Sequence, residues 1–247
     1  MIGVARRISE EIIVRYTRQE LKQDKFAETA KEAVHWTVAH RKTITGALIV
    51  LIVAVVLAAG LFWYHEHRGA LASDQLGKAL VTYNAPIGIP STNKQMVSFQ
   101  TTAERATASK QEFYRISNEF GSTRSGQLAH YFAALCEADL SNYKVAEEQL
   151  KVVASSRDAE VSSLAKLALA SVYRSENKDS DAVTVYKELI EHPTISVPKS
   201  SAQLALASLY EAKQPAEAKK LYQEIAKDDP KSPAAQIAGQ REQAIKQ

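Results

Sequence analysis

The chain has 247 residues, of which 45% are hydrophobic, and its 31 basic and 28 acidic residues give a formal net charge of +3. The excess lies in residues 1–43, because residues 69–247 hold 21 basic and 21 acidic side chains. A neutral C-terminal region lacks the basic surface that neutralises phosphates, which excludes a general nucleic-acid-binding domain. The single cysteine, Cys136, excludes an intramolecular disulfide, and its apolar helical surroundings predict a core position.

Residues 1–43 predict a cytoplasmic N-terminal tail that contains an amphipathic helix. Within segment 24–42, the residues Phe26, Ala30 and Ala33 recur at helical spacing on one stripe. Two interpretations remain open. The helix binds a partner or lies on the membrane surface, or it is a solvated extension of the helix that follows.

Segment 44–64, "ITGALIVLIVAVVLAAGLFWY", has no charged residue. As a helix of about 30 Å it is long enough to cross the hydrocarbon core of a bilayer. The 43 preceding residues and the length of the apolar run favour an uncleaved single-pass anchor over a signal peptide.

Basic residues that flank this segment predict its orientation. In the 20 residues on each side they are Lys25, Lys31, Arg41 and Lys42 before it, and Arg68 and Lys78 after it. The excess before the segment predicts a cytoplasmic N-terminus. In a bacterium the chain would then be anchored in the inner membrane, with its C-terminal domain in the periplasm.

Two near-identical heptads, "LALASVY" at 167–173 and "LALASLY" at 204–210, indicate an internal repeat. Each is followed by a second helical segment, and Ala146, Ala182 and Ala218 in these segments are 36 residues apart. Small residues at such positions let the two helices of a hairpin pack closely. Because one hairpin cannot bury its apolar face alone, neighbouring hairpins are expected to stack.

Weaker matches extend the repeat at both ends. Segments 67–83 and 101–121 predict an earlier hairpin, with Phe113 and Ile116 in its core positions, and segment 232–247 predicts a capping helix.

The sequence therefore predicts an all-α fold in three parts: the tail (1–43), a single N-terminal transmembrane helix (44–64) and a repeat domain (65–247). The repeat domain is expected to be a tetratricopeptide-like α-solenoid of about four helical hairpins plus a C-terminal capping helix. Its period of about 36 residues is close to the 34 residues of a tetratricopeptide repeat.

This layout, with repeat residues such as Leu167, Ala170, Tyr173, Tyr186 and Pro193, resembles the YfgM-like ancillary subunits of the bacterial SecYEG translocon. The repeat domain is also similar to that of periplasmic cell-division coordinator proteins. The first resemblance implies contact with the SecYEG translocon and with periplasmic chaperones, in support of newly exported chains.

Catalytic chemistry is not predicted, because the sequence has no glycine-rich phosphate loop, no paired-cysteine motif and no HExxH. No catalytic residue, cofactor site or metal site is therefore assigned. The two histidines of "HEH" at 65–67 are interpreted as ordinary residues beside a membrane rather than as metal ligands.

Partner binding is predicted instead in the groove that the first helices of the hairpins line. The candidate groove residues are Leu128, Tyr131, Asp139, Ser171, Arg174, Ser208 and Glu211, and the alternative is that they form a solvated helix surface. Tyr131, Leu167 and Leu204 occupy the positions at which some tetratricopeptide domains carry the basic residues of a carboxylate clamp.

The favoured function is a non-enzymatic, membrane-anchored scaffold that binds partner proteins or extended peptides near the translocon. One alternative is a cell-envelope or cell-division organiser that self-associates through the membrane segment and the tail. The other is a regulator of a cytoplasmic partner through residues 1–43.

Overall fold

The computed structural model describes residue 31 and residues 40–88 and 97–245. The amphipathic helix predicted within the tail lies almost wholly outside these residues. The chain divides into two units, Met1–Phe62 and Trp63–Gln247, which are described separately.

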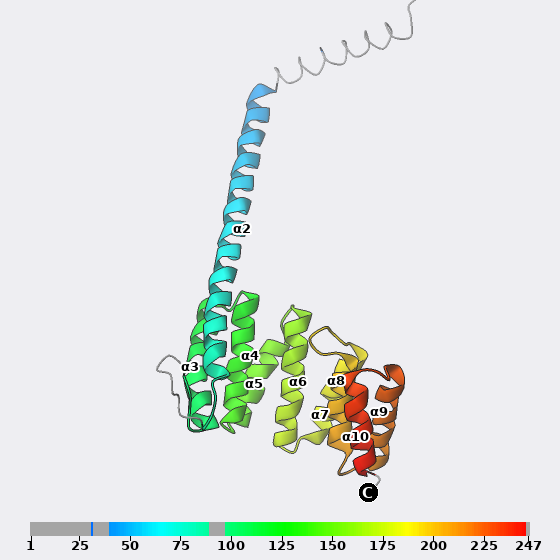
Figure 1. The fold of residues 1–247 in the computed structure, drawn as a ribbon. Helices are drawn as coiled ribbons and strands as arrows, with labels where there is room; N and C mark the ends of the chain where they lie inside the picture. The colour runs from blue at the N-terminus through cyan, green and yellow to red at the C-terminus, as the bar shows by residue number, and fades with distance from the viewer. Residues whose placement is uncertain (1–30, 32–39, 89–96, 246–247) are drawn as a thin grey trace, which may run out of the picture. The chain divides into compact units, whose positions relative to one another are not determined.

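The described residues are almost entirely helical, apart from turns and one isolated bridge between Ile87 and Phe99. Their helices are α2 (Arg41–Tyr83), α3 (Thr102–Phe120), α4 (Arg124–Asp139), α5 (Tyr143–Ala154), α6 (Ala159–Ser175), α7 (Asp179–Glu191), α8 (Lys199–Tyr210), α9 (Pro215–Asp228) and α10 (Pro233–Ile245) (Figure 1). The predicted all-α fold is confirmed.

Helix α2 begins in the first unit and contains the apolar segment. Among the described residues it is the one helix long and apolar enough to cross a membrane, by length and composition, and its most apolar stretch is wholly unburied. The sequence predicts helices at 44–64 and 67–83, and α2 covers both without a break. Residues 65–68, "HEHR", contain neither proline nor glycine, so nothing ends the helix there.

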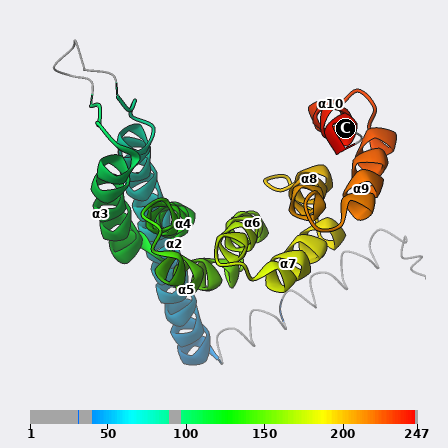
Figure 2. The same cartoon turned by 90° about the horizontal axis from the view of Figure 1, so that it is seen from below.

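The second unit contains the predicted hairpins. The last turns of α2 pack against α3, with Ala72, Leu76 and Ala79 in one core cluster with Phe113 and Ile116. The pairs α4–α5, α6–α7 and α8–α9 follow, and α10 packs on α9 as the cap. Within this unit the hairpins follow an arc, with α4, α6 and α8 along its inner side and α5, α7 and α9 along its outer side (Figure 2).

Buried alanines allow the two helices of each hairpin to pack closely. Ala134, Ala170 and Ala207 on the inner helices and Ala146, Ala182 and Ala218 on the outer helices are all fully buried. The three positions that follow the outer alanines by one turn hold large buried side chains, Leu150, Tyr186 and Tyr222. The repeated heptad thus encodes one packing solution that is used in successive hairpins.

The turns inside the first two of these hairpins also repeat. Ser141 and Asn177, 36 residues apart in the chain, both have φ near +60°, a left-handed conformation that asparagine tolerates well. After each of them an N–H donates to a carbonyl in the last turn of the preceding helix: Asn142 to Glu137 and Lys178 to Tyr173, both at 2.8 Å.

An ionic cluster ties the α4–α5 hairpin to the α6–α7 hairpin. The Glu147 carboxylate on α5 accepts from Lys151 of the same helix at 2.5 Å and from Lys178, which precedes α7, at 2.6 Å. Both ammonium groups also lie over the Tyr173 ring. These hydrogen bonds, the one from Lys151 first, lower the pKa of Glu147 to about 2.

Candidate functional site

All seven predicted groove residues lie on the inner row of helices or at its edge. Leu128, Tyr131 and Asp139 are on α4, Ser171 and Arg174 on α6, Ser208 on α8, and Glu211 directly follows α8. That these residues bind a ligand stays a prediction.

The seven side chains are not equally available. Leu128 packs against two core clusters and Tyr131 against one, so both contribute to the stack of hairpins. Burial raises the pKa of Tyr131, which keeps its hydroxyl protonated. Ser171 and Asp139 are exposed on the inner row and are the predicted residues that a ligand reaches most directly.

Arg174 and Glu211 occupy equivalent positions in successive repeats, four residues after Ala170 and Ala207. Each lies beside a buried tyrosine on the outer helix of its own hairpin. Tyr222 donates its hydroxyl proton to Glu211 Oε1 at 2.7 Å. Burial raises the pKa of Tyr186, and the nearby Arg174 guanidinium opposes that shift.

In the preceding hairpin the same two positions hold Ala138 and Leu150, which need no such bond. At this position the inner-row residue is therefore charged where the outer helix has a tyrosine, and is alanine where the outer helix has a leucine. Sequence reasoning placed Arg174 and Glu211 in the groove but missed this structural role.

A polar cluster at the α3–α4 end of the inner row was also missed. Tyr83 and Arg105 come from the preceding hairpin and join the predicted residues Tyr131 and Asp139. The Arg105 guanidinium carbon lies 5.6 Å from the centroid of the Tyr83 ring. One Arg105 nitrogen makes a long hydrogen bond of 3.5 Å to the Ala85 carbonyl.

The protonation states in this cluster favour hydrogen-bond donation. Desolvation, and then the negative charge of Asp139, raise the pKa of Tyr83 to about 12. Desolvation also raises the pKa of Asp139, and the charge of Arg105 opposes this shift. A guanidinium and neutral phenols beside one exposed carboxylate suit the binding of peptide carbonyls and side-chain carboxylates. The signal in the sequence was weak, because the long segment 84–101 separates Tyr83 from Arg105 and hides their proximity.

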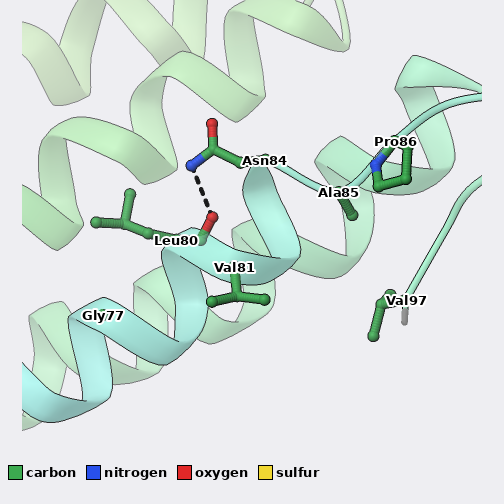
Figure 3. Close-up of a pocket in the computed structure, with 7 residues that line it drawn as sticks. All are labelled: Gly77, Leu80, Val81, Asn84, Ala85, Pro86 and Val97. Atoms are coloured by element: carbon green, nitrogen blue, oxygen red, sulfur yellow. Dashed lines mark hydrogen bonds between the residues drawn. The ribbon is translucent and has the colours of Figure 1, made fainter. Parts of the chain in front are cut away.

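An apolar hollow of about 470 Å³ lies at the end of α2. Gly77, Leu80, Val81, Asn84, Ala85, Pro86 and Val97 line it (Figure 3). The Asn84 side chain donates to the Leu80 carbonyl at 2.8 Å and is thereby turned to its own helix. None of the predicted groove residues lines this hollow.

The described part of the chain holds no group of three or more His, Cys, Asp or Glu residues that could bind a metal ion. Cys136 is buried, and desolvation is the main cause that raises the pKa of its thiol to about 12. A thiol in that state is a poor nucleophile near neutral pH, which agrees with the expected core position.

Comparison with known families agrees with this geometry. The profile described as a tetratricopeptide repeat-like domain matches residues 34–191, more than half of the chain. A second profile, described as a tetratricopeptide repeat, matches residues 201–232, which span α8 and α9. No curated protein and no solved structure matches the chain significantly.

Proposed function

The chain belongs to the tetratricopeptide repeat-like family, and on this premise we propose that it is a membrane-anchored scaffold. Its repeat domain binds partner proteins or exported polypeptides on the outer side of the bacterial inner membrane. Tetratricopeptide domains are protein–protein interaction scaffolds and typically have no catalytic activity.

The observation that carries the proposal is the row formed by α4, α6 and α8 along the inner side of the arc (Figure 2). Such a row offers a continuous surface that a polypeptide can follow over several hairpins. Its exposed and half-exposed side chains are of mixed character: an aromatic and a carboxylate on α4, then a serine and an arginine on α6. This mixture suits the contact of a polypeptide backbone better than the selective binding of one charged ligand.

Membrane anchoring is supported by α2, whose apolar stretch is exposed throughout. Residues such as Leu51, Val55 and Leu57 are more than half exposed, and a soluble protein seldom leaves such a continuous apolar surface in water. The flanking basic residues support a cytoplasmic N-terminus and a periplasmic repeat domain.

The resemblance to ancillary subunits of the SecYEG translocon supports a place beside that translocon and its periplasmic chaperones. In this role the anchor concentrates the repeat domain where exported chains emerge, so that weak contacts suffice for capture.

Topology is tested by a fusion of alkaline phosphatase to the C-terminus, with β-galactosidase as the reciprocal fusion. We expect an active phosphatase and an inactive galactosidase. The reverse result, with both fusions expressed, would refute the periplasmic placement.

Partner binding is tested with a photo-crosslinking amino acid at Ser171 of the full-length chain in bacterial cells. Val145, partly exposed on α5 of the outer row, is the matched control position. We expect adducts with translocon subunits, chaperones or nascent exported chains from position 171 only. Adducts with cell-division or cell-wall proteins would instead favour the envelope organiser, and equal labelling at both positions would refute binding on the inner row.

A further inference from the structure

A hollow of about 390 Å³ opens between α7 and α8. It joins the first turns of α7 to the end of α8 and to the turn that follows. None of the predicted groove residues lines it. Its apolar lining residues are Val183, Leu209 and Tyr210, and its polar ones include Asp179, Lys213 and Gln214.

The equivalent place in the preceding pair of hairpins is filled by the ionic cluster around Tyr173. Tyr173 and Tyr210 end the two near-identical heptads, so they are equivalent in the repeat. Over the Tyr173 ring lie the ammonium groups of Lys151, 5.8 Å from the ring centroid, and Lys178, 5.7 Å from it. The Glu147 carboxylate pairs with both. In one of the two repeats, the tyrosine at this position is therefore a surface that binds cations.

The next repeat lacks the groups that hold cations over the ring. The positions of Glu147, Lys151 and Lys178 are taken there by Val183, Lys187 and Gln214. Lys187 is exposed, and the carboxylate that would hold it over the ring is replaced by valine. Within the described part of the chain, no ammonium or guanidinium group lies over Tyr210. The ring therefore faces the hollow without an internal cation.

The hollow also offers hydrogen-bond acceptors beside this ring. Asp179 pairs with Lys213 through Oδ2, and its Oδ1 atom accepts from no group among the described residues. The Tyr210 hydroxyl and the Gln214 side chain likewise have no hydrogen-bond partner in these residues. The Lys213 side chain is 70% exposed, and an ion pair at such an exposed site is weak enough to exchange.

We propose that this hollow binds an arginine side chain of a partner protein. The planar guanidinium stacks on the Tyr210 ring and donates to the Asp179 carboxylate, from which it displaces Lys213. The aliphatic stem of the arginine packs on Val183 and Leu209. The ammonium group of a lysine has fewer donors and cannot stack, so arginine is favoured.

This contact rests on the proposed function, in that the chain binds partner proteins, and adds a site outside the predicted groove. The test uses the full-length chain in phosphatidylcholine nanodiscs, with a fluorine atom on the Tyr210 ring as the NMR reporter. The probe is N-acetylarginine N-methylamide, for which we expect a Kd of about 1 mM, as its size permits. The citrulline compound, an uncharged isostere, should bind about tenfold more weakly or worse.

Asp179→Asn removes the proposed carboxylate partner and should weaken binding of the arginine compound about tenfold. Asp181→Asn is the matched control, because Asp181 lies in the same first turn of α7 but does not line the hollow. It should leave the Kd within about twofold of the unsubstituted chain. Circular dichroism and thermal melting confirm that each variant is folded.

Lys213→Glu should act in the opposite direction. It removes the cation that competes for Asp179 and places a carboxylate where the preceding repeat has Glu176, three residues after the tyrosine. Binding of the arginine compound should become about tenfold tighter, whereas an apolar ligand would be indifferent to this change.

Three results would each overturn the inference. They are equal binding of the arginine and citrulline compounds, equal effects of Asp179→Asn and Asp181→Asn, and no shift of the fluorine signal with up to about 20 mM of the arginine compound. Each would leave the proposed binding on the inner row intact, since that is tested separately by crosslinking from Ser171.

Discussion

Substitution of Gly126 by alanine should disrupt the contact between α3 and α4. Gly126 is buried in the first turn of α4, and a Cβ atom there would lie 2.0 Å from the Phe120 carbonyl oxygen and 2.9 Å from the Gly121 nitrogen. An ordinary van der Waals contact is 3.4–4 Å, so the backbone would have to move by more than 1 Å. The same oxygen accepts from the Thr123 N–H and hydroxyl, both at 2.8 Å, and these bonds would break as well.

Because the clashing atoms belong to the backbone, no side-chain rotation relieves the overlap. We expect Gly126→Ala to lower the free energy of unfolding by about 3 kcal/mol or more, at the upper end of the overpacking range. Urea unfolding of the full-length chain in detergent, followed by circular dichroism, measures the loss.

Gly239→Ala is the matched control. Gly239 lies inside α10, and apart from the backbone of its own helix no described atom lies within 4 Å of the place that a methyl group would take. Alanine there should stabilise by about 0.5–1 kcal/mol through helix propensity. If Gly126→Ala unfolded at the same urea concentration as the unsubstituted chain, the close approach of α3 and α4 would be refuted.

Three further predictions concern single groups. Cys136 should resist labelling by a thiol reagent at about pH 8 in the folded chain and react fully in urea, because its thiol is buried and its pKa is raised to about 12. Rapid labelling of the folded chain would contradict this prediction. The pKa of Glu147 is lowered to about 2 in the folded chain, from 4.5, so its stabilisation is present above pH 4.5 and is lost as the pH falls toward 2. Glu147→Gln should flatten this acid dependence of the melting temperature, and an unchanged profile would count against the ionic cluster. Glu211→Ala should lower the free energy of unfolding by about 1–3 kcal/mol, because it leaves the Tyr222 hydroxyl without its acceptor. Adding Tyr222→Phe to the same chain should restore most of this loss. Strictly additive losses from the two substitutions would contradict the hydrogen bond.

The hairpins could be predicted because their packing depends on small and large residues at a fixed period. The alanines at 146, 182 and 218 are all fully buried, as their equal spacing predicts. The first hairpin matches the repeat less well, yet its predicted core residues Phe113 and Ile116 are also fully buried. Local periodicity determines these positions, and periodicity is visible in one sequence.

The details of the inner surface depend on contacts between distant segments and could not be predicted. The Arg105 guanidinium lies over the Tyr83 ring across a long connection, and the Ile195 N–H donates to the carboxylate of Glu160, 35 residues earlier. No spacing rule links such pairs. Arg174 lies on α6 of the inner row, but its place beside Tyr186 on α7 became visible only with both helices in place.

The matched pairs of Arg174 with Tyr186, Glu211 with Tyr222 and Ala138 with Leu150 make the hairpins alike in shape but different in chemistry. A whole hairpin carries its own matched pair and could be duplicated or transplanted intact. Exchange of only one helix would set a charged side chain against leucine, or leave a tyrosine hydroxyl facing alanine. Recombination within this domain is therefore expected to succeed at hairpin boundaries and to fail at the turns inside them.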